Sequence, residues 1–278
     1  FQNQLCRVEQ NHLWLESLMI KFNFKLFFLS FLLIFSLKPL QSAEMVDPIK
    51  INWSFKGLTG TFDRASLQRG FQVYKEVCAS CHSMQYLSYR NLGEPGGPEF
   101  SEQEVKAIAA SFEIEDGPDS QGEMFTRPGR PSDKFKSPYP NVQAATAANG
   151  GAYPPDMSVL VKARKGGANY IYSVLVGYED PPPGVNLDDG VYYNKYMVGN
   201  KIKMPNNLMD GLVEYADGTE STVDQMAKDV TTFLAWAAEP ELEERHKTGI
   251  KVIIYLVLLT LLVYLSMKKI WSRIDTEV

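Results

Sequence analysis

Two long apolar runs lie near the ends of the chain, at residues 26–37 and 252–267. The first is too short to cross a bilayer, which takes about 20 residues in a helix. The second has no charged residue, and a helix counted from 250 to 271 would be about 33 Å long, which is enough to cross. Its apolar side chains lie on all faces of the helix, as expected of a membrane span rather than a buried amphipathic helix. We therefore expect one transmembrane helix at residues 250–271.

Between these runs, three segments carry apolar residues at helical spacing. The first is expected to begin near Asp63 and to lead directly into a pair of cysteines. The second opens with a capping box formed by Ser101 and Glu104. The third begins near Thr222 and stops before Pro240, which cannot continue a helix interior. The pattern predicts a mainly α-helical domain.

Nine of the sixteen prolines lie between Pro95 and Pro155, so this region is expected to be largely loop. Short strands are expected around residues 192–197 and 211–215. The predicted fold class is therefore mainly α with long loops and one C-terminal transmembrane helix.

The N-terminal segment has the order of a secretory signal: two lysines, the short apolar run, and a polar stretch that ends at Ala43. Met19 precedes the run, so we expect residues 1–18 to lie upstream of the natural start. Residues 19–43 would then be a signal peptide cleaved after Ala43. The alternative is an uncleaved N-terminal anchor.

An exported N-terminus and one later span divide the rest of the chain. We expect a periplasmic domain at residues 44–239, a linker at 240–249, the span at 250–271 and a cytoplasmic tail at 272–278. Basic residues are balanced on the two sides of the span, so the orientation follows from the signal. This organisation predicts a protein of the bacterial inner (cytoplasmic) membrane.

With 45% hydrophobic and 22% charged residues, the composition is globular and excludes disordered, collagen-like and disulfide-scaffold proteins. The net charge of -5 argues against nucleic acid as a partner. Between Glu94 and Glu123 there are nine carboxylates and one lysine, Lys106. This stretch is either a solvated loop face or a surface that attracts a basic partner.

The strongest chemical motif is Cys78-Ala-Ser-Cys81-His82, the C-x-x-C-H attachment signature of a c-type haem. Two thiols on one turn can bond to the two vinyl groups of one porphyrin, and the adjacent imidazole then lies under the iron. A thioredoxin-like dithiol would need a βαβ context, which the pattern lacks. A zinc site would need more ligands than three Cys and three His offer, since Cys6 and His12 fall in the leader.

The sixth iron ligand is open between a methionine, a lysine such as Lys203, an amine, water and a vacant position. Methionine is the common partner of His in electron-transfer cytochromes. Met204 is favoured because it lies on a loop stiffened by the next proline, just before the last soluble helix. Met197 and Met209 are lesser candidates.

Five stretches closely resemble one family. They are Cys-Ala-Ser-Cys-His-Ser-Met at 78–84, Tyr-Pro-Pro-Asp-Met-Ser at 153–158, Lys-Ala-Arg-Lys-Gly-Gly at 162–167, Gly-Tyr-Glu-Asp-Pro-Pro-Pro-Gly at 177–184 and Ala-Lys-Asp-Val-Thr-Thr-Phe-Leu-Ala-Trp-Ala-Ala-Glu-Pro-Glu at 227–241. The family is cytochrome c1, the membrane-anchored haem subunit of cytochrome bc1 complexes. The resemblance implies a class I cytochrome c-like haem domain in which Gly70 and Tyr74 cross Phe233 and Trp236.

The resemblance also implies one covalent haem c. It assigns cofactor contacts to Cys78, Cys81, His82, Met204, Arg164, Tyr170, Asn149, Pro154 and Pro155. His82 and Met204 would be the axial ligands. Arg164 would pair with a haem propionate, a contact that Tyr170 would share, and Pro154 and Pro155 would form the wall of the haem edge after Asn149.

The implied function is the transfer of single electrons from a Rieske iron-sulfur subunit to a soluble or anchored cytochrome c. The chain would not be catalytic alone. Its other partners would be a cytochrome b subunit and the lipid bilayer, in a dimeric complex. The alternatives are an anchored cytochrome subunit of a terminal oxidase and a haem sensor or catalyst with an open sixth position.

Overall fold

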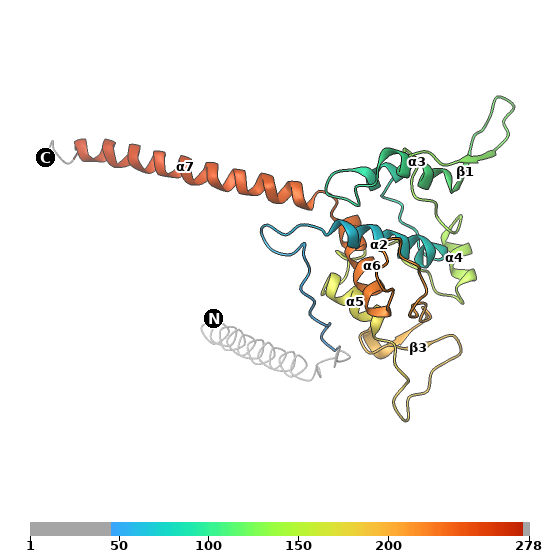
Figure 1. The fold of residues 1–278 in the computed structure, drawn as a ribbon. Helices are drawn as coiled ribbons and strands as arrows, with labels where there is room; N and C mark the ends of the chain where they lie inside the picture. The colour runs from blue at the N-terminus through green and yellow to red at the C-terminus, as the bar shows by residue number, and fades with distance from the viewer. Residues whose placement is uncertain (1–45, 275–278) are drawn as a thin grey trace, which may run out of the picture. The chain divides into compact units, whose positions relative to one another are not determined.

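The computed structural model describes residues 46–274. The expected start at Met19, the signal peptide at 19–43 and its cleavage after Ala43 lie outside the described residues. The elements are α2 (Arg64–Glu76), the 3-10 helices η1 (Cys78–Ser80) and η2 (Tyr89–Gly93), α3 (Glu102–Ala110), β1 (Glu113–Asp116), β2 (Phe125–Pro128), α4 (Val142–Ala148), α5 (Ala168–Val176), β3 (Tyr192–Tyr193), the 3-10 helix η3 (Val198–Asn200), β4 (Lys201–Ile202), α6 (Val223–Ala238) and α7 (Leu242–Ile274) (Figure 1).

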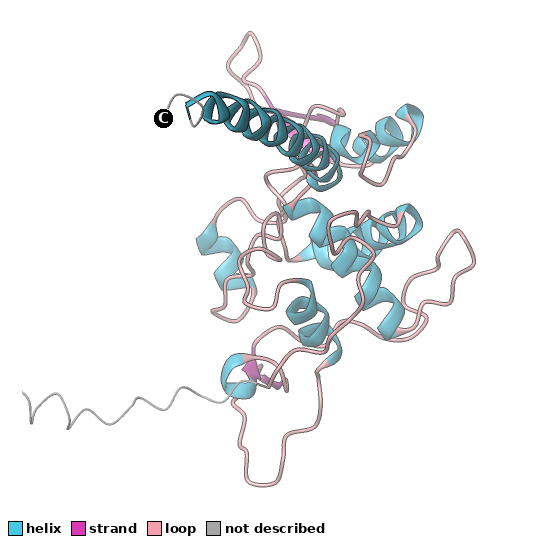
Figure 2. Ribbon diagram, turned by 90° about the vertical axis from the view of Figure 1, so that its left-hand side faces the viewer, coloured by secondary structure: helices cyan, strands magenta, loops and turns pink. Residues whose placement is uncertain are grey.

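Helices are the main regular structure of the described part of the chain, and long loops connect them (Figure 2). Its strands form two antiparallel pairs, β1 with β2 and β3 with β4. The predicted fold class, mainly helical with one apolar C-terminal helix, is confirmed.

The predicted helix starts are confirmed, and each is fixed by a local side-chain cap. The Asp63 side chain accepts from the backbone N–H of Ser66 at 2.7 Å, and the Thr222 hydroxyl accepts from that of Gln225 at 3.1 Å. Ser101 and Glu104 form the expected reciprocal capping box at the start of α3. These short-range contacts explain why the sequence pattern located α2, α3 and α6.

The crossing of α2 and α6 forms the centre of the core. Gly70 permits it, since a Cβ atom there would lie 2.1 Å from the Asp229 carbonyl oxygen and 2.7 Å from Cβ of Phe233. The Tyr74 and Phe233 rings lie 5.8 Å apart. The expected contact of Gly70 and Tyr74 with Phe233 is therefore confirmed. Trp236 covers Gly97, where a Cβ atom would lie 2.9 Å from the indole.

A buried ion pair joins the same two helices. Arg69 of α2 donates from Nε and Nη2 to the two oxygens of Asp229, at 2.8 and 3.1 Å. Gln225 also donates to Asp229, at 3.0 Å, and the Asp229 side chain is only 1% exposed. Three donors thus satisfy a carboxylate that would otherwise be costly to bury.

The strand predictions were only partly right. Within residues 192–197, only Tyr192–Tyr193 is a strand, and it pairs with β4. Residues 211–215 form no strand. Gly211 has a φ of +77° and lies inside a turn that the Leu212 N–H closes on the Met209 carbonyl, while Val213 and Tyr215 are buried at a spacing of two, which imitates a half-buried strand in the sequence.

Besides the expected α3, the proline-rich region contains regular structure that was not expected, namely the β1–β2 hairpin and α4. The hairpin strands are mostly exposed and polar, so they lack the apolar alternation that marks a half-buried strand. The sequence pattern had no signal for them.

Helix α7 begins at Leu242, so most of the expected linker at 240–249 is helical. Its first turn is attached to the domain, because the buried Glu243 accepts from Nη1 and Nη2 of Arg64 at 2.7 and 2.9 Å and from the Phe62 backbone N–H at 2.9 Å. From Val252 onward the apolar side chains are exposed, and the helix is long and apolar enough to cross a membrane.

Candidate functional site

The C-x-x-C-H motif lies at the C-terminal end of α2, where the helix tightens into η1. The backbone N–H groups of Cys81 and His82 both donate to the Cys78 carbonyl, at 3.1 and 2.9 Å. These bonds close a single turn that holds both thiols and the imidazole. Cys78 and Cys81 are free thiols, on residues that keep some exposed surface.

His82 is 8% exposed, and its Nδ1 atom lies 2.8 Å from the Pro155 carbonyl oxygen. A carbonyl only accepts, so Nδ1 carries the proton and Nε2 keeps a free lone pair. Burial lowers the pKa of His82, although the hydrogen bond to Pro155 opposes this shift. The result is a neutral imidazole with Nε2 available, which is the form that ligates a metal.

Residues 82–86, which include His82, lie beside residues 155–158, and several hydrogen bonds join the two segments. We call residues 82–86 and 155–158 the histidine clamp. Besides the His82–Pro155 bond, it contains hydrogen bonds from Ser83 Oγ and the Gln85 N–H to Asp156 (2.8 and 3.0 Å), from the Met157 N–H to the Ser83 carbonyl (2.8 Å), and from the Tyr86 N–H to Ser158 Oγ (3.1 Å). The role of Asp156 was missed from the sequence, where only the Asp-x-Ser turn, closed by the Ser158 N–H at 2.8 Å, could have indicated it.

The environments of the methionines differ sharply. Met84, Met157 and Met226 are core residues, at 0%, 7% and 0% exposure, whereas Met209 is 62% exposed. The sulfur of Met197 accepts a hydrogen bond from the Tyr170 hydroxyl at 3.3 Å. Met204 is partly buried and packs against the core. Among these, Met204 best combines shelter with an uncommitted sulfur.

The loop that carries Met204 is held at two points. Tyr178 donates to the Met204 carbonyl at 3.0 Å, and Lys203 donates from Nζ to the Gly150 carbonyl at 2.8 Å. Gly150 lies five residues before Pro155, so one short segment touches both the Met204 loop and His82. Lys203 itself is engaged by this contact.

The other residues that the sequence predicted lie in different settings. Asn149 donates to the Ala145 carbonyl at 2.7 Å and ends α4, while Pro154 is partly buried. Arg164 is exposed, makes no salt bridge among residues 46–274, and donates to its neighbour's carbonyl. Tyr170 is buried, and burial raises its pKa while Arg164 opposes the shift. A propionate contact by Arg164 and Tyr170 stays a prediction.

The cysteine environment argues against a redox dithiol. Burial, with a smaller contribution from Cys81, raises the pKa of the Cys78 thiol to about 12. A reactive thiolate requires a lowered pKa. Within the part of the chain that the structure describes, no three His, Cys, Asp or Glu side chains gather where they could hold a metal ion.

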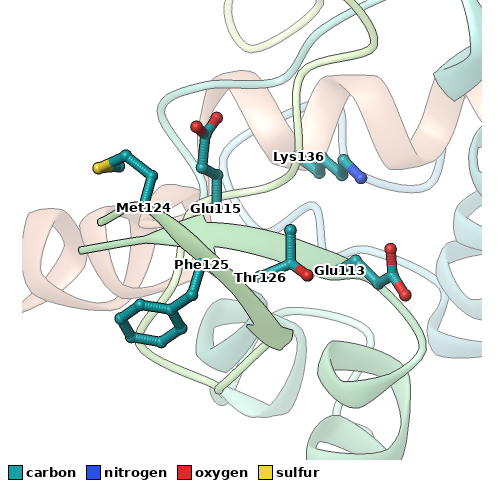
Figure 3. A pocket seen from close by; sticks show the side chains of 6 residues that line it. All are labelled: Glu113, Glu115, Met124, Phe125, Thr126 and Lys136. Carbon is teal, nitrogen blue, oxygen red and sulfur yellow. The ribbon is translucent and has the colours of Figure 1, made fainter. Parts of the chain in front are cut away.

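The β1–β2 hairpin carries the second half of the acidic stretch and a groove of about 520 Å³, which Figure 3 shows with Glu113, Glu115, Phe125 and Lys136 among its lining residues. Several of the nine carboxylates are neutralised locally. Examples are Asp116 with Arg127, and Glu102 with Lys106. The ones that make no salt bridge within residues 46–274 include the exposed hairpin glutamates, which are Glu113, Glu115 and Glu123.

Comparison with known proteins places this geometry in context. A model of the cytochrome C1 family matches residues 53–274. The mitochondrial cytochrome c1-2 heme protein of Solanum tuberosum is 53% identical over 225 residues, which cover 81% of this chain and 85% of that protein. Cytochrome c1 of Rhodospirillum rubrum is 48% identical over 241 residues, covering 81% and 88%. A cytochrome b/c1 of Bradyrhizobium diazoefficiens is 50% identical over 239 residues, and this chain spans 35% of its length.

Proposed function

Because the chain belongs to the cytochrome c1 family, we propose that it is the haem c subunit of a cytochrome bc1 complex. In this role it passes single electrons from a Rieske iron-sulfur protein to a soluble cytochrome c. The observation that carries the proposal is the state of His82, whose protonated Nδ1 is held by a carbonyl while Nε2 is free, next to two free thiols on the same turn.

The residues present fit a covalently attached haem. Cys78 and Cys81 would form the thioethers, and His82 and Met204 would ligate the iron. When bound, haem c supplies a one-electron Fe(III)/Fe(II) couple, and His/Met ligation favours a raised potential.

The chain's own contribution is to hold the donors and limit water. The Pro155 carbonyl orients the imidazole, and the Tyr178 hydroxyl and Lys203 ammonium restrain the Met204 loop. The buried side chains of α2 and α6 belong to the core against which Cys78 packs. A rigid ligand set needs little reorganisation when the charge of the site changes by one, which favours electron transfer over bond chemistry.

The negative charge of the hairpin favours a positively charged protein as the electron acceptor. The three hairpin glutamates are exposed and unpaired among the described residues, so their field extends into solvent. Such a field accelerates the encounter with a positively charged soluble cytochrome c without requiring a tight complex.

Helix α7 supports membrane anchoring. We place the haem domain on the periplasmic side and the C-terminus in the cytoplasm, on the strength of the N-terminal signal pattern. A cytochrome b subunit would be the membrane partner, in a dimeric complex.

Two measurements test this proposal. The full chain, expressed in a host that attaches haem c, should give a c-type pyridine haemochrome, and a Cys78→Ala/Cys81→Ala variant should lose covalent haem. Gentle detergent purification through a C-terminal tag should recover a b-type cytochrome and a Rieske protein. Haem that acidified acetone extracts from the wild type, or recovery of oxidase subunits instead, would overturn the assignment.

A further inference from the structure

The carbonyl that orients His82 belongs to the peptide bond between Pro155 and Asp156. A peptide unit is planar, so the direction of the Pro155 carbonyl is set largely by where Asp156 is held. Whatever fixes Asp156 therefore also fixes the hydrogen-bond acceptor of the imidazole.

Asp156 is held by three hydrogen bonds. One carboxylate oxygen accepts from Ser83 Oγ at 2.8 Å and from the Gln85 N–H at 3.0 Å, and the other accepts from the Ser158 N–H at 2.8 Å. Ser83 is 8% exposed and Ser158 is fully buried, so two of the donors are well shielded from water. Hydrogen bonds to an ionised acceptor are stronger than neutral ones.

Two of these donors come from the residues directly after His82. The carboxylate therefore ties the acceptor of the imidazole to the same stretch of chain that carries the imidazole. The Met157 N–H, which donates to the Ser83 carbonyl at 2.8 Å, fixes the register of the two segments.

We infer that Asp156 is a positioning residue for His82, which keeps the Pro155 carbonyl aligned with Nδ1–H and so maintains the donor strength of Nε2. This inference rests on the proposed function, because it concerns the orientation of a haem ligand. An acceptor on the distal ring nitrogen fixes the tautomer and raises the basicity of the ligating nitrogen, which favours the ferric state.

The test uses the full haem-loaded chain in mild detergent, labelled with 15N-histidine. Two quantities are measured: the solvent exchange rate of the His82 Nδ1 proton in the reduced protein, and the reduction potential. In Asp156→Ala the proton should exchange about tenfold faster, because the loss of all three bonds to the carboxylate lets the Pro155 carbonyl move away from Nδ1–H. The potential should rise. Asp156→Asn keeps one acceptor oxygen and should show the same changes, but smaller.

Asp119→Asn is the matched control, because Asp119 also accepts backbone N–H groups, those of Gln121 and Glu123 at 2.8 and 3.0 Å, but in the hairpin loop. It should change neither quantity. If Asp156→Ala fails to load haem, Asp156→Asn and Ser83→Ala still decide, since each removes only part of the network.

The inference is overturned if the Asp156 variants load haem but keep the wild-type exchange rate. If the Asn and Ala variants then also raise the potential equally, the carboxylate acts through its charge alone. Failure of the proposed function is distinguishable, since the wild type itself would then give no c-type haemochrome.

Discussion

Replacement of Gly70 by alanine tests the packing that supports the cysteine motif. A Cβ atom at this position would lie 2.1 Å from the Asp229 carbonyl oxygen, 2.6 Å from its carbonyl carbon and 2.7 Å from Cβ of Phe233. Since the first two atoms are backbone, no rotamer change relieves the contact. Helices α2 and α6 would have to separate.

The expected cost follows from two opposing effects. Alanine in a helix interior gains about 1 kcal/mol over glycine. Overpacking a close contact costs about 1–3 kcal/mol, and occasionally more. Because the clash here is with backbone, we take the upper end of the overpacking range or slightly above it, and expect the free energy of unfolding to fall by about 2–3 kcal/mol.

Urea unfolding of the full chain in mild detergent, followed by tryptophan emission, measures this change. Gly249→Ala is the matched control, because Gly249 is also helical but has no heavy atom within 4 Å of the added Cβ. It should leave stability unchanged or slightly raised. A Gly70→Ala variant as stable as the Gly249→Ala variant would refute the close-packed crossing.

Three further predictions concern the site, the hairpin and the anchor. Met204→Leu should change the free energy of unfolding by less than about 1.5 kcal/mol, yet lower the reduction potential and abolish the thioether-to-iron absorption. Met209→Leu should change neither the potential nor the absorption, and a Met204→Leu variant that keeps both would exclude Met204 as the ligand. Reversal of all three hairpin glutamates to lysine should slow the reduction of a basic cytochrome c at low ionic strength but have little effect at high salt, where charges are screened; an equal low-salt rate would argue against steering. The hydrogen bond from Arg64 holds the pKa of Glu243 below its ordinary 4.5, so its contribution to stability is complete above that value and is lost as pH falls through the folded pKa. Glu243→Gln should therefore flatten the loss of stability on acidification, and unfolding curves between pH 3 and 7 that stay parallel to the wild type would contradict this.

The parts of the fold that the sequence predicted correctly depend on short-range chemistry. The caps at Asp63, Ser101 and Thr222 each act within three residues, and they located the starts of three helices. The attachment of the first turn of α7 to the domain was missed, because Glu243 is bound by Arg64 and the Phe62 N–H, which lie 179 and 181 residues away. No local pattern contains that information.

The same division applies to the site. The turn from Cys78 to His82 is local, so the motif alone predicted which donors it brings together. The bond from His82 to the Pro155 carbonyl spans 73 residues, and the bond from Lys203 to Gly150 spans 53. Asp156 was not among the predicted residues because its bonds to Ser83 and Gln85 span 73 and 71 residues.

The order in which the chain is synthesised bears on how haem can be attached. The motif is complete once residue 82 has emerged, whereas the helix partners of α2 arrive much later: Asp229 follows Arg69 by 160 residues, and Glu243 follows Arg64 by 179. Contacts that close such long loops form late, because the entropy of closure is lost before the contact compensates for it. Before α6 docks, the end of α2 that leads into the two cysteines is therefore uncovered. An attachment enzyme would have its widest access to the thiols in that interval, and the docking of α6 would end it.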